Sequence, residues 1–374
     1  MSEAFSIEEA VGEAVLRVDR LLMRFADTFP SAATEGGIYK PVEKVDWTEG
    51  FWTGLLWLSY EATGHERYRK AAHHLLPQFR ERLEKGIKIN THDLGFLYSL
   101  SCVASWKLTG DENARDTALW AAKLLYERYD PTAGVIQAWG DLNDPARQGR
   151  MIIDCNLNLP LLFWAAKESG NREYACAAVS HLDRAMKYLV REDASTYHTF
   201  YMDVHTGRPI KGSTHQGYSD ESCWARGQAW AIYGFALNYR NDKNRELLEV
   251  SARTADYFLS HLPEDGICYW DLIFQPEDRQ CRDTSAAAIA VCGLLELLRE
   301  LPLTDPRRKN YEAAVYRIMT SLREYYLTRH EDGILLHGVY NYGRQMGIDE
   351  QNLWGDYFYM EALIRMRQIW NPYW

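Results

Sequence analysis

The segment from His92 to Tyr129 reads HDLGFLYSLSCVASWKLTGDENARDTALWAAKLLYERY, and it contains two kinds of helix in succession. The run from Leu94 to Trp106 is apolar or small at nearly every position, which is typical of a helix buried on all sides. From residue 111 onward, apolar residues recur at helical spacing and charged residues fill the other positions, which predicts a half-exposed amphipathic helix. The join at residues 109–111, Thr-Gly-Asp, ends one helix with Gly and begins the next with a polar residue.

The same pair of helices recurs along the whole chain. An aspartate or arginine stands at the front of five further buried runs, at Asp46-Trp47-Thr48, Asp154-Cys155-Asn156, Trp224-Ala225-Arg226-Gly227, Asp283-Thr284-Ser285 and Trp354-Gly355-Asp356. Amphipathic stretches alternate with them at about residues 7–25, 65–83, 111–129, 172–189, 243–262 and 305–327. Such a repeat predicts a closed double ring of helices, an (α/α)6 barrel, with an open helical solenoid as the alternative. In a closed ring, the charged fronts of the inner helices meet at one place and form a site.

The 374 residues are predicted to form one domain, residues 1–374, because no Pro-, Ser- or Gly-rich linker divides them and a ring must close as one unit. One long loop, from Arg191 to Cys223, carries an alternating stretch at residues 197–203 and then a turn-like stretch at 205–208. This pattern predicts a short β-hairpin at the rim of the barrel. Functional residues collect on long loops held by a rigid scaffold, and this one carries His198, His215 and Gln216 ahead of Arg226.

Charge and composition exclude several classes of protein. A net charge of −10 opposes a polyanionic partner such as nucleic acid. The amino-terminal residues do not resemble a signal peptide, and no apolar run is long enough to span a membrane. Seven cysteines without a Cys-x-x-Cys pair favour reduced thiols in a cytoplasm. We expect acid/base chemistry without a metal or cofactor, because His and Cys show no ligand spacing and no nucleotide-binding motif is present.

Aspartate at the front of a helix has a simple structural interpretation, because its carboxylate accepts the free N–H groups of the first turn. Capping is therefore the first hypothesis for Asp46, Asp93, Asp283 and Asp356. Asp154 differs, because apolar residues precede it and Pro160, which suits the first turn of a helix, follows closely. A carboxyl group that is flanked by apolar residues and faces a second carboxyl group has a raised pKa, and this would suit a proton donor.

Several motifs, in order and at matching spacing over nearly the whole chain, resemble those of the unsaturated glucuronyl hydrolases of glycoside hydrolase family 88. They include Asp46-Trp-Thr-x-Gly-Phe-Trp, His92-Asp-Leu-Gly-Phe, Ile136-Gln-Ala-Trp-Gly, Ile152-Ile-Asp-Cys-x-Leu-Asn-Leu-Pro, Tyr197-His-Thr-Phe-Tyr, Gly212-x-Thr-His-Gln-Gly and Trp224-x-Arg-Gly-Gln-Ala-Trp. The resemblance implies an (α/α)6 barrel. It also implies a substrate made by polysaccharide lyases, an unsaturated uronyl disaccharide or short oligosaccharide. Such enzymes hydrate the C4=C5 vinyl ether, so the usual inverting and retaining schemes do not apply.

The resemblance also implies roles for individual residues. Asp154 matches the family's acid/base aspartate and Asp93 its second essential aspartate. Residues that match its substrate contacts are Trp47, His92, Trp139, His198, His215, Gln216, Arg226 and Trp230. Among these, Trp47 and Trp139 resemble aromatic walls, Arg226 and Trp230 resemble residues at the neighbouring sugar, and His215 either contacts substrate or orders the Gln216 loop.

One departure from the family bears on specificity. Some members that favour sulfated disaccharides carry a Ser-x-Ser-x-Lys pattern near the C-terminus, whereas the stretch Tyr340–Met346 has neither Ser nor Lys. This favours unsulfated or lightly sulfated chondroitin or hyaluronan disaccharides, or similar products from gellan or xanthan, although Arg344 could still pair with a sulfate.

Two alternatives remain open from the sequence. The unsaturated rhamnogalacturonyl hydrolases, which act on pectin fragments, have the same barrel and an aspartate acid. A non-catalytic carbohydrate-binding ring protein would account for the aromatic residues and the capped helices, but not for the presence of both Asp93 and Asp154.

Overall fold

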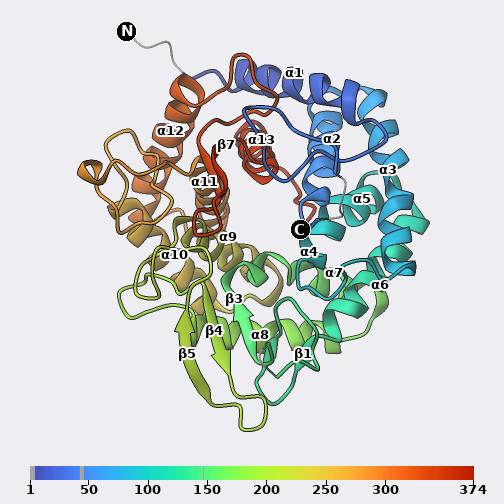
Figure 1. Cartoon of the computed structure of the whole chain (residues 1–374), viewed down its shortest axis with the longest axis vertical. Coiled ribbons are helices and arrows are strands. Elements are labelled where there is room, and N and C mark those ends of the chain that lie inside the picture. Colours follow the sequence, from blue (N-terminus) through green and yellow to red (C-terminus); the bar gives the residue numbers. More distant parts are fainter. Residues whose placement is uncertain (1–4, 43–45, 146) are drawn as a thin grey trace.

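The computed structural model describes residues 5–42, 46–145 and 147–374, and its helices form two concentric rings (Figure 1). The outer ring consists of α1 (Ile7–Phe25), α3 (Glu66–Glu84), α6 (Glu112–Tyr126), α8 (Glu173–Tyr188), α10 (Arg245–Ser260) and α12 (Arg307–Tyr325). The inner ring consists of α2 (Glu49–Thr63), α4 (Leu94–Tyr98) with η1 (Ser99–Val103) and α5 (Ala104–Thr109), α7 (Pro160–Ser169), α9 (Ala225–Asp242), α11 (Thr284–Glu300) and α13 (Leu353–Arg367). Because α13 packs against both α1 and α2, the ring closes. The predicted (α/α)6 barrel is confirmed, and an open solenoid is excluded.

The two rings differ in burial as their sequences predict. Helix α9 is buried at every position from Ala225 to Asn238, whereas α6 buries one face, which includes Ala114, Ala118 and Leu125. The predicted join at residues 109–111 is also present. Gly110 ends α5 in the left-handed conformation at φ 72°, where a side chain would add strain. The next residue, at the N-cap of α6, accepts a hydrogen bond from the N–H of Ala114 at 3.2 Å.

Glycines allow the inner helices to approach one another closely around the ring. A Cβ atom added at Gly95 on α4, for example, would lie 2.2 Å from the Cα atom of Asn158. Four more glycines lie close to a neighbouring inner element in the same way, namely Gly50 (α2), Gly234 (α9), Gly293 (α11) and Gly355 (α13). Backbones this close bring the fronts of the inner helices towards one site.

The described residues also form three small antiparallel sheets in the loops of the barrel. Strands β1 (Tyr129–Asp130) and β2 (Val135–Ile136) form the first, and β3 (Arg150–Ile152), β4 (Thr199–Met202) and β5 (Pro209–Ser213) form the second. The third pairs β6 (Gly338–Asn341) with β7 (Met346–Glu350). The β4–β5 hairpin confirms the predicted rim hairpin, and β3, which leads directly into the short 3-10 helix η2 (Ile153–Leu157), pairs with β4. The β6–β7 hairpin was not predicted.

Side-chain capping is confirmed for one of the four aspartates. Asp283 caps α11, because its Oδ1 atom accepts hydrogen bonds from the N–H groups of Ser285 and Ala286. Capping is wrong for the other three, Asp46, Asp356 and Asp93. Asp46 and Asp356 are not the N-cap residues of α2 and α13, and Asp93, which is the N-cap residue of α4, makes no side-chain cap bond. The carboxylate of Asp356 makes tertiary contacts instead, and that of Asp93 contacts its chain neighbours Thr91 and His92.

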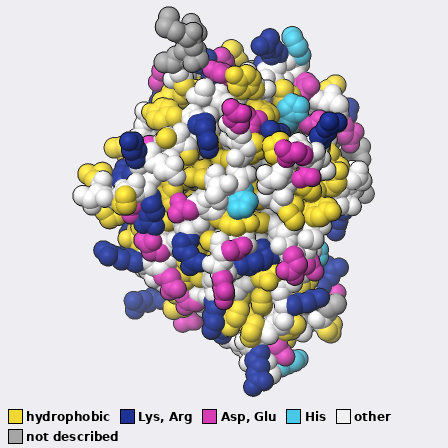
Figure 2. Space-filling model, turned by 90° about the vertical axis from the view of Figure 1, so that its left-hand side faces the viewer, with side chains coloured by type: hydrophobic (Ala, Val, Ile, Leu, Met, Phe, Trp, Pro, Cys, Tyr) yellow, Lys and Arg dark blue, Asp and Glu magenta, His cyan; other side chains and the backbone are white. Residues whose placement is uncertain are grey.

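The outer surface is mixed in charge. On the face shown in Figure 2, acidic and basic side chains are interspersed, with hydrophobic side chains between them. All seven cysteines are free thiols. Among the helices that the structure describes, none has the length and apolar character needed to cross a bilayer.

Candidate active site

A cavity of about 210 Å³ lies where the inner helix fronts meet the rim loops. Its walls include nine of the ten residues that the sequence predicts for the site, namely Trp47, Asp93, Trp139, Asp154, His198, His215, Gln216, Arg226 and Trp230. The tenth, His92, is 0% exposed and does not line the cavity. The front of α2, the front of α4, η2, the rim sheet and the front of α9 thus contribute to one surface.

The two candidate catalytic carboxylates face each other across His92. The Nε2 atom of His92 lies 3.4 Å from Oδ1 of Asp93 and 3.2 Å from Oδ1 of Asp154. The carboxylate side chains are 12% and 18% exposed respectively, so both can reach the cavity. His92, Asp93 and Asp154 each offer one atom that could bind a metal ion, and these atoms lie within 4.8 Å of one another. The imidazole itself, however, contacts both carboxylates. The arrangement is that of an ion-paired triad, in which the ring supplies the positive charge.

The contact between α4 and η2 holds these carboxylates together. Asp93 is the N-cap residue of α4, and Asp154 is the second residue of η2. Asn158 joins the two elements, because its Oδ1 accepts from the N–H of Phe96 at 2.7 Å and its Nδ2 donates to the carbonyl of Asp154 at 3.2 Å. Gly95 leaves the room that Asn158 occupies. Two short backbone segments thereby fix the separation of the carboxylates.

Charge pairing shifts the pKa values of His92 and Asp93. Burial alone would lower the pKa of His92, but the charges of Asp154 and Asp93 hold it well above the usual value of 6.5. Burial alone would raise the pKa of Asp93, but the charge of His92 and a hydrogen bond from the Thr91 hydroxyl hold it below its ordinary value. At neutral pH, Asp93 is therefore a carboxylate paired with an imidazolium.

The rim loop presents a neutral imidazole to the cavity. The Nδ1 atom of His198 accepts hydrogen bonds from the backbone N–H groups of His215 and Gln216, at 3.0 and 3.2 Å. Burial, with the nearby positive charges of His215 and Arg226, holds the pKa of His198 well below its usual value. Because Nδ1 accepts, the neutral ring carries its hydrogen on Nε2 and can donate it to a ligand.

Arg226, predicted to contact a neighbouring sugar, has most of its hydrogen-bonding capacity satisfied by the protein. Its Nη1 atom lies 3.0 Å from Oδ2 of Asp283 and donates to the carbonyl of Val339. Its Nη2 atom donates to Oε1 of Gln216 at 2.9 Å and to the carbonyl of Tyr340 at 2.7 Å. The guanidinium is buried and its charge is matched by Asp283. Arg226 therefore orders Gln216 and the β6–β7 hairpin at the cavity wall.

Aromatic rings form much of the remaining wall. Trp47 packs against Phe96 and Trp354 at centroid distances of 5.5 and 5.3 Å, and its indole N–H donates to the Tyr340 hydroxyl at 3.0 Å. Trp139 lies under the guanidinium of Arg150 at 3.8 Å. Fixed aromatic faces beside polar groups suit a ligand with both apolar and hydroxyl-bearing faces, such as a sugar.

Four residues that line the cavity were not among the predicted site residues, namely Trp224, Tyr340, Asn341 and Arg344. Three of them belong to the β6–β7 hairpin or its turn. The turn residues Asn341-Tyr342-Gly343, set between two short runs, are a hairpin signal that the helical periodicity of the chain obscured. Their presence in the cavity depends on contacts between segments more than 100 residues apart, as in the bonds between Arg226 and residues 339 and 340.

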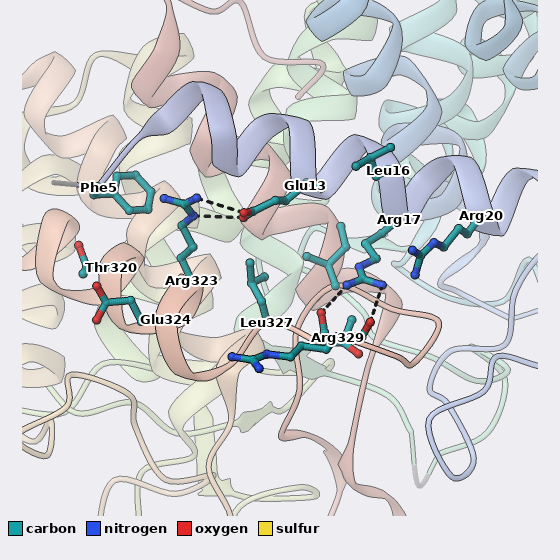
Figure 3. A pocket seen from close by; sticks show the side chains of 13 residues that line it. Phe5, Glu13, Leu16, Arg17, Arg20, Thr320, Arg323, Glu324, Leu327 and Arg329 are labelled. Carbon is teal, nitrogen blue, oxygen red and sulfur yellow. Dashed lines mark hydrogen bonds and ion pairs between the residues drawn. The ribbon is translucent and has the colours of Figure 1, made fainter. Parts of the chain in front are cut away.

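A second, wider groove lies on the outside of the ring between α1 and α12 (Figure 3). Its walls include Arg17, Arg20, Arg323 and Arg329, and Arg323 pairs there with Glu13. None of the predicted site residues lies in it.

An (α/α)6 barrel whose mouth combines paired carboxylates, polar rim residues and aromatic walls defines the active site of a carbohydrate-degrading enzyme. Comparison with known proteins identifies the class. The family model described as Glycosyl Hydrolase Family 88 matches residues 18–370. The chain belongs to glycoside hydrolase family 88, and it is a glycosidase.

Two relatives, one of them compared in two structures, agree with this assignment. An unsaturated chondroitin disaccharide hydrolase from Streptococcus pneumoniae is 46% identical over 374 residues, covering 98% of this chain and 94% of the relative. The crystal structure of an unsaturated glucuronyl hydrolase from Streptococcus agalactiae superimposes with a TM-score of 0.97 at 44% identity, covering 100% of this chain and 95% of that one. An aspartate-to-asparagine mutant of that enzyme, complexed with dGlcA-GalNAc6S, has a TM-score of 0.89 at 41% identity, with 100% and 95% coverage.

Proposed function

We propose that the protein releases the 4,5-unsaturated uronic acid from the non-reducing end of lyase-generated glycosaminoglycan oligosaccharides. The observation that carries the proposal is the pair of carboxylates, Asp93 and Asp154, on the wall of a cavity with aromatic sides. The names of the relatives support the substrate class. A site that takes such a substrate must protonate a vinyl ether and deliver water, and these are acid/base steps that carboxyl groups perform.

In the proposed mechanism, Asp154 is the general acid and base. It transfers a proton to C4 of the unsaturated ring, so that positive charge develops at C5. The carboxylate of Asp93 stabilises that charge. Asp154 then accepts a proton from the water that adds to C5, and the resulting hemiketal opens and releases the aglycone. The overall reaction adds one water molecule, and Asp154 ends protonated.

The remaining cavity residues bind the sugars in this proposal. The Nε2–H group of His198 and the amide of Gln216 donate to the unsaturated sugar, and Trp47 and Trp139 hold its faces. Trp230 lies at the neighbouring sugar. Arg226 supports Gln216 through the 2.9 Å bond between them, which agrees with a positioning role better than with direct recognition of an acidic group.

The chain is also proposed to act in the cytoplasm on small anionic sugars, without a nucleic-acid partner. Free thiols at all seven cysteines agree with a reducing compartment. The net charge of −10 opposes binding of a long polyanion.

The test follows the ultraviolet absorbance of the conjugated C4=C5 bond in an unsaturated chondroitin disaccharide. Wild type should remove the absorbance, and Asp154→Asn should be slower by about 10²- to 10⁴-fold, because an amide cannot donate a carboxyl proton. Asp183→Asn is the matched control, because Asp183 is an exposed aspartate on the outer helix α8. It should keep the wild-type rate.

Two outcomes would contradict the proposal in different ways. If wild type leaves the absorbance of several unsaturated glycosaminoglycan disaccharides unchanged but consumes unsaturated galacturonyl-rhamnose, the enzyme acts on pectin fragments. If Asp154→Asn keeps the wild-type rate, the reaction stands and Asp154 loses its role.

A further inference from the structure

His92 lies behind the catalytic carboxylates rather than beside the substrate. Its side chain is 0% exposed, and the ring nitrogen Nε2 contacts Oδ1 of both Asp93 and Asp154. Oδ1 of Asp154 is itself buried. Because the carboxylate as a whole is 18% exposed, its other oxygen, Oδ2, is the one that the cavity can reach. His92 thus contacts the non-reacting side of the acid.

The contact is electrostatic in kind. Among the described residues, neither ring nitrogen of His92 nor Oδ1 of Asp154 has a well-aligned hydrogen bond. Unsatisfied buried polar atoms are costly, so the opposite charges at 3.2 and 3.4 Å must stabilise the arrangement. Without a cation between them, two carboxylates this close repel each other. The raised pKa of His92 and the lowered pKa of Asp93 agree with this pairing of opposite charges.

Other ionisable groups around the triad do not replace His92. The Cys155 thiol lies next to the ring, and burial raises its pKa, so it stays neutral. Burial, together with the charge of His92, lowers the pKa of His181 to about 3, so that ring is also neutral. The neutral His198 lies on the rim side, and its pKa too is lowered by the charge of His92.

Two arginines and one aspartate complete the surroundings of Asp93. Arg128 donates to the carbonyls of Gln137 and Ala138, and Arg82 is paired with Glu49 at 3.0 Å. Asp46 adds negative charge on the α2 side. The arginines are engaged elsewhere, so His92 is the cation in contact with both catalytic carboxylates.

We propose that His92 is a positioning residue whose imidazolium keeps Asp93 ionised and holds Oδ1 of Asp154, so that Oδ2 faces the reacting carbon. This inference rests on the proposed function and extends it. When Asp154 transfers its proton to C4, the carboxylate that forms already has a positive partner. When Asp154 takes a proton from the attacking water, the pairing with His92 weakens again. His92 itself exchanges no proton with the substrate.

The kinetic test uses His92→Gln, because the glutamine amide occupies the place of Nε2 and donates a hydrogen bond without a charge. We expect kcat to fall by about 10²-fold, while KM changes by less than about threefold, because no substrate contact is lost. The acidic limb of the kcat/KM profile should move to higher pH. Without the cation, burial raises the pKa of Asp93, so its ionisation requires a higher pH.

The control is His181→Asn, because the asparagine oxygen can replace Nδ1 of His181 as acceptor of the Ile136 N–H. This variant should keep both the wild-type kcat and the wild-type pH profile. A large rise in KM for His92→Gln at unchanged kcat would overturn the inference in favour of a direct substrate contact. An unchanged kcat and profile would overturn it as well.

A second readout does not depend on turnover. In ¹⁵N NMR spectra of the free protein, the ring of His92 should show the shifts of an imidazolium at neutral pH, and a neutral ring there would overturn the inference. The charged state should disappear in Asp154→Asn combined with Asp93→Asn. If no disaccharide is consumed but the ring is charged, the proposed function fails and the ion-paired triad stands.

Discussion

Arg226 and Arg344 both lie on the cavity wall, but they differ in the charge that they offer a ligand. The guanidinium of Arg226 is buried and paired with Asp283 at 3.0 Å, so recognition of a sulfate there would require breaking a buried pair. Arg344 is exposed at the turn of the β6–β7 hairpin, and its backbone N–H bonds to Asn341. Among the described residues of the cavity, Arg344 is therefore the arginine available to an anionic substituent.

This difference predicts a modest dependence on sulfation. Wild type should hydrolyse unsulfated unsaturated chondroitin disaccharide at least as well as a sulfated one, and Arg344→Gln should lower kcat/KM for the sulfated substrate by no more than about fivefold, because exposed ion pairs are weak. Values of kcat/KM for both disaccharides, measured at low and at high salt, check this. Arg208→Gln, on the exposed loop between β4 and β5, serves as the control. A preference of wild type for the sulfated substrate by tenfold or more would contradict the expectation.

At the scale of elements, the contact between α4 and η2 sets the separation of the two proposed catalytic carboxylates, Asp93 and Asp154. The backbones meet where Gly95 faces Asn158, and an added Cβ would lie 2.2 Å from the Asn158 Cα. Such a clash cannot be relieved by a side-chain rotation, because the obstacle is backbone. The two elements must separate, and the carboxylates carried by them separate with them.

Gly95→Ala should therefore reduce activity more than stability. Overpacking costs about 1–3 kcal/mol, and a displacement of about 1 Å in catalytic geometry costs about 10²-fold in rate. Urea unfolding and kcat of the same preparations measure both effects. Gly12→Ala is the matched control, because Gly12 lies in α1 with no atom within 4 Å of an added Cβ. That variant should be stabilised by up to about 1 kcal/mol at unchanged kcat. Equal kcat for Gly95→Ala and wild type would show that the contact does not set the geometry.

At the scale of the whole molecule, the ring closes through two carboxylates near the C-terminus, Glu350 and Asp356, that bind the segment preceding the first inner helix. Asp356 on α13 accepts hydrogen bonds from the Tyr39 hydroxyl at 2.9 Å and from the N–H groups of Ile334 and Leu335. Glu350 accepts from the N–H groups of residues 36 and 37. Both contacts span more than 300 residues of sequence. They join the two ends of the repeat.

Asp356 makes this closure sensitive to pH. Burial raises its pKa from 3.8 to about 7, so the folded state binds the proton more tightly than the unfolded state does. Stability from this group is therefore full below about pH 4 and is lost as the pH rises towards 7. Asp356→Asn keeps the shape and removes the titration. Urea unfolding at pH 5 and pH 8 should show that the variant gains stability relative to wild type at the higher pH, by a few kcal/mol. Parallel changes in the two proteins would contradict the assignment.

The sequence by itself determined the barrel. Hydrophobic periodicity is local, since it depends on which residues share a helix face. It predicted the outer helices to within a few residues of their observed bounds, and it marked the front of each inner helix. The Gly joins and the alternation of buried and amphipathic runs then left few topologies for closure. The sequence also predicted that Asp93 and Asp154 share one site, because both stand at the fronts of buried helices and match motifs of the family, and both line the cavity.

Only the tertiary structure decided which side of each residue faces the cavity. His92 and Asp93 are neighbours in the chain, yet one is fully buried and the other lines the cavity, and no periodicity distinguishes them. Arg226 and Asp283, which form an ion pair, are 57 residues apart in the chain. The local sequence around Arg226 therefore does not show that its charge is neutralised. The β6–β7 hairpin reaches the site through such distant contacts as well. Long-range contacts depend on the packing of the whole ring, whereas helices depend on residues three and four positions apart.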